Sequence, residues 1–356
     1  MNFKSLFLGS TAVIAAATGA NAADPVVVVE PAAPNYVEVC DAFGAGYFYI
    51  PGTETCLDIG GYVRFQVDAN DDDWGVMTRG HLDVTAKSDT ELGVLTGDIE
   101  INANAYSDNR DNDVVLDNAY IGLGGFQAGY FDTYWDEGLT GEVDDLAGNT
   151  KITEMRYIYA ANGFIAALAL DALEADMVSG LGNGSTDMNK LGVAGRVGFN
   201  AGGVNAKLDI GYDTYNEEAA FRALGEFAAG PGSILLGGLY NTGASAYAKT
   251  WELDQGGFSD TYYGYSEWAV AAGYRMDVTD KFRVTPMVQY TQLKTDKSLG
   301  LADDPDAWSG GMYFEYELVK DFWAKLNVQY TDYNDDLADY AGKSDWAGYF
   351  RLQRDF

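Results

Sequence analysis

The chain has 356 residues, with 54 Asp and Glu against 22 Lys and Arg, which gives a formal net charge of −32 at pH 7. Such a surface repels phosphate backbones, so the composition argues against nucleic-acid binding. The chain is 14% aromatic, with 25 Tyr, which is too much for an acidic disordered protein. Its single His leaves few ways to build a metal centre or a His-dependent catalytic triad.

Residues 1–22 have the features of a secretory signal peptide. Lys4 supplies the positive start, residues 6–17 are mostly apolar, and Ala20-Asn21-Ala22 matches the small-residue cleavage pattern. A membrane anchor is the alternative, but Ser and Thr interrupt this short apolar run. The rest of the sequence has no run of about 18 apolar residues and therefore offers no transmembrane helix. We expect an exported protein whose mature chain begins at Ala23.

Cys40 and Cys56 are the two cysteines of the chain. An even cysteine count in an exported protein predicts a disulfide, and closing this loop would stabilise the fold by about 3 kcal/mol in the chain-entropy model. Two free thiols are the alternative. The residues between them are too rich in Gly to form a helix, and residues 24–36, with three prolines, predict an extended lead-in.

From Leu57 onward, apolar and polar residues alternate with the period of a β-strand. The pattern is clear in residues 57–67, 79–87, 204–213 and 322–330, where one face is apolar and the other carries charge, including Arg and Lys. A soluble β-sandwich gives the same alternation, because its core face is apolar and its outer face is wet. Three further features favour a membrane barrel instead.

The first feature is the rhythm of the connections. Short Gly, Asn or Asp turns alternate with long acidic connections along the chain, as in outer-membrane barrels, which have short turns at one rim and long loops at the other. The short turns lie at 124–125, 161–163, 200–203, 229–232 and 278–280. The long connections include 132–151, 172–188, 241–260, 292–306 and 332–345.

The second feature is the spacing of aromatic residues. Phe282 and Tyr290 bracket one apolar strand face, and Phe322 and Tyr330 bracket another. Eight residues span roughly 26 Å along a strand, or about 20 Å of height at a tilt of about 40°. This spacing predicts two aromatic girdles on either side of a lipid-facing band.

The third feature is the C-terminal segment, in which Trp346, Phe350, Leu352 and Phe356 fall on one strand face. A terminal aromatic residue that ends an alternating strand is similar to the recognition signal of bacterial outer-membrane barrels. Arg354 falls on the same face, but a long side chain near a rim can extend to water.

These patterns predict an all-β fold, a sixteen-stranded antiparallel transmembrane β-barrel between Leu57 and Phe356. The short segments near Phe221 and Ile234 are the weakest predictions, which leaves fourteen or eighteen strands as alternatives. Pro286 lies inside a predicted strand and cannot donate a ladder hydrogen bond, which indicates either a bulge or a wrong register.

Residues 39–57, which hold both cysteines, together with 61–64 and 117–126, resemble the alphaproteobacterial porin family. The resemblance covers the whole chain. It implies a sixteen-stranded, trimeric general porin of the bacterial outer membrane, whose third long loop folds into the lumen as a constriction. The chain is then expected to divide into a signal peptide (1–22), a periplasmic lead-in with the Cys40–Cys56 loop (23–55) and the barrel (56–356).

A barrel of this size leaves an aqueous channel that the charged strand faces would line. The third long loop, from about Asp132 to Glu154, is strongly acidic and contains one base, Lys151. Its acids are Asp132, Asp136, Glu137, Glu142, Asp144, Asp145 and Glu154, and the first six are the expected constriction residues. The expected basic wall opposite consists of Arg64, Arg79, His81 and Lys87.

This arrangement predicts passive diffusion of ions and small hydrophilic solutes with a modest cation preference, because single charges in water interact weakly. The alternative is that the acids only solvate the loop. A substrate-specific channel would need an aromatic row, for which Trp323 and Tyr313 are scattered candidates. An outer-membrane hydrolase could use His81 and Asp83, but no Gly-x-Ser-x-Gly motif is present.

We assign no cofactor and no metal-binding residue. The acidic loops, such as 68–73 and 108–113, do not match an EF-hand, which requires Gly at its sixth position. Divalent cations could bridge these loops to lipopolysaccharide, and outer-membrane lipid is the other expected partner.

Overall fold

The computed structural model describes residues 38–71, 73–107, 111–173, 190–254, 261–295, 305–334 and 344–356. The expected signal peptide and most of the lead-in lie outside these ranges. The chain divides into two units, Met1–Glu38 and Val39–Phe356, and the second contains all of the described strands. In the part of the chain that is described, no helix has the length and apolar character needed to cross a bilayer.

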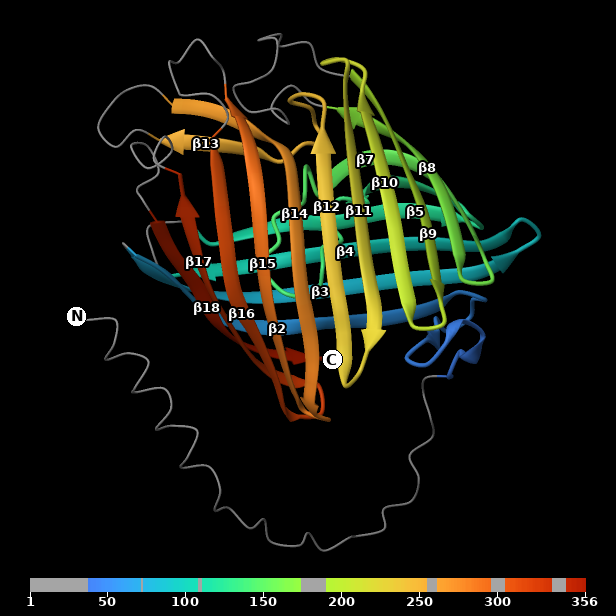
Figure 1. Cartoon of the computed structure of the whole chain (residues 1–356). Coiled ribbons are helices and arrows are strands. Elements are labelled where there is room, and N and C mark those ends of the chain that lie inside the picture. The colour runs from blue at the N-terminus through green and yellow to red at the C-terminus, as the bar shows by residue number, and fades with distance from the viewer. Residues whose placement is uncertain are drawn as a thin grey trace, which may run out of the picture. The chain divides into compact units, whose positions relative to one another are not determined.

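The second unit is a closed antiparallel β-barrel (Figure 1). Of the eighteen described strands, β1(Phe48–Tyr49) and β13(Thr250–Asp254) are short additions, and the other sixteen form the wall, which closes where β18 pairs with β2. The sixteen wall strands are β2(Cys56–Asn70), β3(Trp74–Thr90), β4(Gly93–Tyr106), β5(Asp113–Leu123), β6(Phe126–Asp132), β7(Lys151–Ala161), β8(Phe164–Leu173), β9(Lys190–Ala201), β10(Val204–Asp213), β11(Glu218–Ala229), β12(Gly232–Asn241), β14(Thr261–Thr279), β15(Phe282–Thr295), β16(Asp306–Val319), β17(Phe322–Tyr333) and β18(Ser344–Asp355).

The apolar strand faces point outward. In β2, Ile59 and Val63 keep 48% and 53% of their surface exposed, whereas Gln66, on the opposite face, is buried. A soluble sandwich would bury its apolar face, so this exposure excludes that alternative. The alternation therefore produces an apolar belt on the outside and a polar lumen, as lipid on one side and water on the other require.

Strand number and register agree with the sixteen-strand prediction. The two weak segments, near Phe221 and Ile234, are the regular partners β11 and β12. Around Pro286 the β14–β15 pairs Gly273–Met287 and Met276–Val284 keep one register, and Pro286 itself pairs across β16. The prediction of a bulge or a shifted register at Pro286 is therefore wrong. The register shifts between β14 and β15 lie nearer the ends of β14.

The short connections are tight hairpins at one rim. Between β7 and β8, Asn162 and Gly163 have φ angles of 52° and 78°. Two successive positive φ angles are those of a type I′ turn, whose twist matches that of the strands it joins. The long connections leave the other ends of the strands, and the one after β6 turns back into the barrel.

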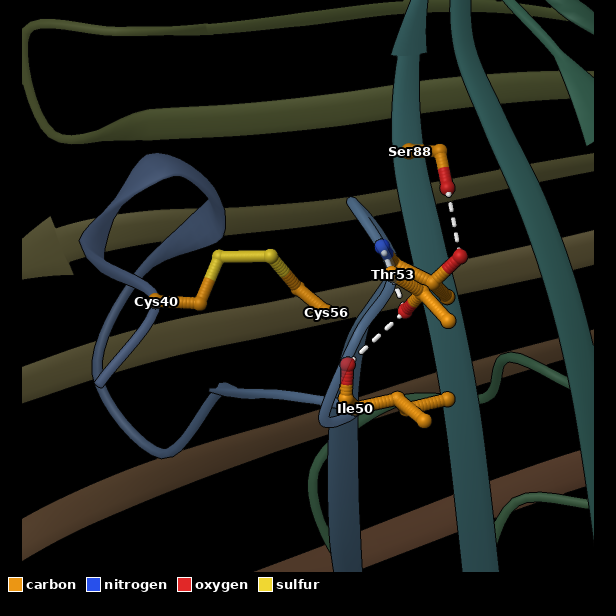
Figure 2. The surroundings of a disulfide bond; sticks show 6 residues. Cys40, Ile50, Thr53, Cys56 and Ser88 are labelled. Atoms are coloured by element: carbon orange, nitrogen blue, oxygen red, sulfur yellow. Dashed lines mark hydrogen bonds between the residues drawn. A yellow bond between two sulfur atoms is a disulfide. The ribbon is translucent and has the colours of Figure 1, made fainter. Parts of the chain in front are cut away.

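Cys40 and Cys56 form a disulfide at the short-turn rim, where Cys56 begins β2 (Figure 2). Both cysteines are buried with Tyr47 in a small apolar cluster. The intervening loop contains one turn of 3₁₀-helix at Asp41–Phe43, a small departure from the expected absence of helix. Figure 2 shows the Thr53 hydroxyl donating to the Ile50 carbonyl at 2.9 Å, which closes the second half of the loop.

Replacing both cysteines with serine should lower the free energy of unfolding by about 3 kcal/mol without opening the barrel, because the bond constrains a loop at the end of β2. Urea unfolding in lipid vesicles, followed by tryptophan fluorescence, measures this difference. Reduced wild-type protein is the matched control and should unfold at the same urea concentration as the variant. Equal stability of the oxidised and reduced proteins would contradict the prediction.

Candidate channel constriction

The connection between β6 and β7, residues 133–150, lies inside the lumen, and we call it the inner loop. The Asp145 N–H donates to Oε1 of Gln289 on β15 at 2.8 Å, and Glu142 accepts a hydrogen bond of 2.5 Å from Tyr349 on β18. Glu137 is paired with bases on β9 and β10. Because these partners face the lumen from distant parts of the wall, the inner loop crosses the channel.

The inner loop begins close to Asp132, where the constriction loop was expected to begin, but it ends before the predicted end at Glu154. Lys151 already pairs with Asp132 in the β6–β7 ladder. Glu154 therefore lies on β7 and not in the loop. Asp132 and Lys151 also form an ion pair between their side chains, so the Asp132 carboxylate is neutralised at the strand end.

Two arginines of the wall hold the inner loop. Arg222 is 1% exposed and donates to the Trp135 carbonyl at 2.8 Å and to the Tyr134 carbonyl. Arg196 donates to the same Tyr134 carbonyl at 2.8 Å. Asp209 accepts from both guanidiniums, at 2.6 Å from Arg196 and 2.9 Å from Arg222, and neutralises part of their charge. Backbone oxygens that would otherwise be buried without donors are satisfied in this way.

Apolar packing fixes the inner loop against the same side of the wall. Leu146 is buried against Leu224 and Leu239, on β11 and β12. A Cβ atom on Gly237 of β12 would lie 2.5 Å from Leu146 Cδ1, so the missing side chain leaves room for the loop. Larger side chains at this position would push the loop toward the channel axis.

A second inner segment, residues 242–249 after β12, supports the loop from one end. The Asn149 side chain donates to the Ala246 carbonyl at 2.6 Å, and the Ala246 N–H donates to Asp213 on β10 at 3.1 Å. Tyr247 is buried, donates to Asp171 on β8 and contacts the ring of Trp135. No sequence prediction assigned this segment to the lumen.

The inner loop contains five acids and no base, but two of the five are paired. Glu137 forms ion pairs with Arg196 and Lys207, and the Asp145 carboxylate lies 3.0 Å from Lys249 Nζ. The other three have no ion pair with any base in the described residues, and we call them the free loop acids. They are Asp136, Glu142 and Asp144.

The surroundings change the acidity of two loop carboxyls in opposite directions. Burial raises the pKa of Asp144 to about 6, although the Leu139 N–H stabilises the charged form by donating to Oδ2 at 3.0 Å. Burial acts in the same direction on Glu137, but Lys207 and Arg196 outweigh it and hold the pKa of Glu137 below its ordinary value. Asp144 is therefore the loop acid whose charge changes closest to neutral pH.

Arg64 and Arg79, from the expected basic wall, are cross-strand partners on β2 and β3. Arg64 Nε donates to Gln353 on β18 at 3.0 Å. Glu142 of the inner loop reaches this part of the wall through its bond to Tyr349, whose ring lies under another base, Arg351, at 4.3 Å. This is the part of the expected wall that the loop approaches.

His81 and Lys87 have other neighbours. The His81 ring stacks on Tyr62 at 4.6 Å, and its Nε2 lies 3.7 Å from Oε2 of Glu100. Lys87 lies over the ring of Tyr47, beside the disulfide loop at the short-turn rim. In the described residues, neither contacts an acid of the inner loop.

The two candidates for an aromatic row, Tyr313 and Trp323, lie on different strands and have different surroundings. Tyr313, on β16, is buried, and Trp323, on β17, lies under the guanidinium of Arg283 at 5.7 Å. Neither side chain offers the continuous exposed ring surface that a sugar slide requires.

A closed barrel with a lipid-facing apolar belt, a charged lumen and a loop folded inside is the architecture of an outer-membrane porin. The family model described as "Porin subfamily" matches residues 24–354, and the chain belongs to this family. Outer membrane protein IIIA of Rhizobium leguminosarum bv. viciae is 40% identical, covering 98% of this chain and 93% of the relative. Porin Omp2b of Brucella abortus is 32% identical over all of both chains.

Solved structures share the fold at low sequence identity. The outer membrane channel DcaP of Acinetobacter baumannii is 13% identical, with a TM-score of 0.64 over 86% of this chain and 99% of the other. An anion-selective porin from Comamonas acidovorans is 14% identical, with a TM-score of 0.57 over 85% and 100%. The protein is thus an alphaproteobacterial porin of the outer membrane, and its relatives indicate a channel and not an enzyme.

Proposed function

We propose that the inner loop is the constriction of a passive diffusion channel and gives it a modest preference for cations. The observation that supports this is the loop's charge: it has five acids and no base, and three of the acids have no ion pair with any base that the structure describes. A unit charge about 4 Å from an ion contributes only ~1 kcal/mol in water, so we expect a several-fold preference and no strict ion selection.

The wall opposite the loop tip contributes to the same filter. Arg64 and Arg79 face the lumen there, and Arg351 joins them. Acid on the loop and base on this wall create a transverse field across the part of the lumen beside the contact between Glu142 and Tyr349. His81 lies among carboxylates and Lys87 lies at the short-turn rim, so we leave both of them out of this field.

The expected assembly and processing belong to the same proposal. Porins of this family are typically trimers, which supports a homotrimer. Residues 1–22 are then removed as a signal peptide, and residues 23–55 remain on the periplasmic side. The acidic external loops bind lipopolysaccharide through divalent cations.

Reversal potentials across a planar bilayer under a KCl gradient test the cation preference. We expect the sign that denotes faster K⁺ than Cl⁻ permeation. A sign that denotes anion preference would overturn the proposal, and such a preference is described for the Comamonas porin, which shares the fold. Saturable block of the current by a sugar would instead favour a substrate-specific channel.

The cation preference should fall as the pH is lowered from about 7.5 to about 5. Asp144, with a pKa of about 6, is charged above this pH and mostly neutral below it. The folded loop holds this proton more tightly than an unfolded chain does, so protonation of Asp144 stabilises the folded protein at low pH. This contribution to the stability is lost as the pH rises through about 6. Reversal potentials at a series of pH values measure the change.

Asp144→Asn is the matched variant for the pH series. It should lack the change near pH 6 and keep the changes of the other loop carboxyls, among which Asp136 also has a pKa raised by burial. If the variant and the wild type show the same pH profile, Asp144 does not contribute to the filter.

A further inference from the structure

Four carboxylates and the single histidine gather on the lumen face of β3, β4 and β5, and in the described residues none of them forms an ion pair or a hydrogen bond with the inner loop. We call them the wall cluster: His81, Asp83, Asp98, Glu100 and Asp117. Asp83 and Glu100 are direct cross-strand partners. Like charges in this position destabilise a sheet unless something neutralises them.

A β-bulge brings the fourth carboxylate into the cluster. The β4–β5 register shifts between Glu100 and Ile101, whose partners are Asn118 and Leu116, so that Asp117 is the extra residue on β5. Bulges redirect side chains in this way. Oδ2 of Asp117 lies 3.9 Å from Nδ1 of His81, on the same face as the rest of the cluster.

The ligand atoms are close enough to share an ion. Carboxylate oxygens of Asp83, Asp98 and Glu100 all lie within 4.8 Å of one another. Two oxygens on opposite sides of a Ca²⁺ ion are about 5 Å apart, so these three fit around one cation. His81, Glu100 and Asp117 form a second group within the same limit, which places the imidazole beside the three-carboxylate group.

Asp98 gives an independent indication of a ligand. The residue is 6% exposed, and its Oδ2 accepts a hydrogen bond from the Thr85 hydroxyl at 2.8 Å. Its Oδ1 is also buried, yet it has no hydrogen-bond partner in the described structure. A buried carboxylate oxygen is costly unless a donor or a cation satisfies it.

The nearby lysines pair with other carboxylates or lie too far from the three-carboxylate group to form an ion pair with it. Lys151 Nζ lies 3.3 Å from Asp117, and the same ammonium also pairs with Asp132. Within the described residues, no Lys or Arg forms an ion pair with Asp83, Asp98 or Glu100. The three carboxylates therefore keep an excess of negative charge.

We propose that Asp83, Asp98 and Glu100 bind one hard divalent cation, such as Ca²⁺ or Mn²⁺, on the wall of the lumen. Oxygen-only ligands suit such ions, and water from the lumen completes the coordination shell. Thr85 is a positioning residue that orients Asp98, and His81 lies at the edge of the site. A bound ion adds two positive charges to this part of the wall.

The single histidine makes the site observable in the wild-type protein. The full barrel, purified without a histidine tag and labelled with ¹⁵N-histidine, should give the ring signals of one imidazole, and the Nε2 signal is the one followed. Sub-stoichiometric Mn²⁺ should broaden this signal, and excess Ca²⁺ should restore it by displacing the paramagnetic ion. A signal that stays sharp at one equivalent of Mn²⁺ would overturn the proposal, whatever the ion selectivity of the channel.

Variants separate this site from the acidic loops. Glu100→Gln and Asp98→Asn should each weaken Mn²⁺ binding by at least about tenfold, since even indirect partners of a metal site contribute that much. Glu315→Gln, a lumen-facing carboxylate on β16 that lies near Lys325, is the matched control and should bind as the wild type does. Equal broadening in Glu100→Gln and wild type would assign the ion to another site and contradict the proposal.

Discussion

Replacing Arg222 with methionine is expected to give a wider and noisier channel, with a larger single-channel conductance and faster entry of larger sugars. The guanidinium is buried and donates to the Trp135 and Tyr134 carbonyls of the inner loop, and methionine supplies no donor in its place. Removing one partner of a buried ion pair costs about 3–5 kcal/mol, which is enough to release the loop from this wall. Planar-bilayer recordings and liposome swelling with sugars of increasing size measure the effect.

Arg275→Met is the matched control for this prediction. Arg275 lies on β14, faces the lumen and pairs with Glu226 at 2.7 Å, but none of its described contacts is with the inner loop. Its conductance and sugar cut-off should stay close to those of the wild type. If Arg222→Met shows an unchanged cut-off, or if both variants widen the channel equally, Arg222 does not hold the constriction in place.

Neutralising the three free loop acids together should abolish the cation preference. In the variant Asp136→Asn, Glu142→Gln, Asp144→Asn, the remaining loop acids are those already paired with Arg196, Lys207 and Lys249. The basic wall around Arg351 then faces a loop without free charge. The reversal potential under a KCl gradient should move to zero or to the anion side.

A control with the same change in net charge tests whether position matters. Asp71, Asp73 and Asp111 lie in the connections after β2 and β4 and are exposed. Their simultaneous replacement by asparagine should leave the reversal potential almost unchanged, because salt screens such charges over roughly 8 Å. A shift as large as that of the loop variant would show that total charge, and not the inner loop, sets the preference.

The wall of the barrel could be predicted from the sequence because each strand has its own signal. Alternation with period two places Ile59 and Val63 outside and Gln66 inside, and a one-residue slip would put apolar side chains into the lumen. The tight turn at Asn162 and Gly163 is equally local. The disulfide could be predicted from the cysteine count and the export of the protein alone. The structure confirms the bond between Cys40 and Cys56.

The partners of the inner loop could not be predicted in the same way. Lys207 lies on a strand face that alternation correctly identifies as polar, but its partner Glu137 is 70 residues away. That contact depends on the path of the loop, which non-local packing around Leu146 and Gly237 determines. Strand order alone favoured the bases of β2 and β3 and did not reveal Arg196, Lys207 and Arg222.

The sequence contains even less information about the second inner segment and the wall cluster. Tyr247 is one of 25 tyrosines, and nothing in its neighbourhood distinguishes a residue buried in the lumen from one at the membrane interface. The ligands of the wall cluster lie on three strands and come together through a cross-strand pair and a bulge at Asp117. A search for linear metal-binding motifs cannot detect such a group.

The pairing of β18 with β2 has a consequence for how the protein reaches its folded state. The closing register joins Phe350 to Val67, so the last contact of the wall links segments from the two ends of the barrel sequence. Until it forms, two strand edges carry unpaired backbone groups that hydrocarbon cannot satisfy. Closure over such a long separation is slow, and we expect the nascent barrel to need a protected edge until β18 arrives.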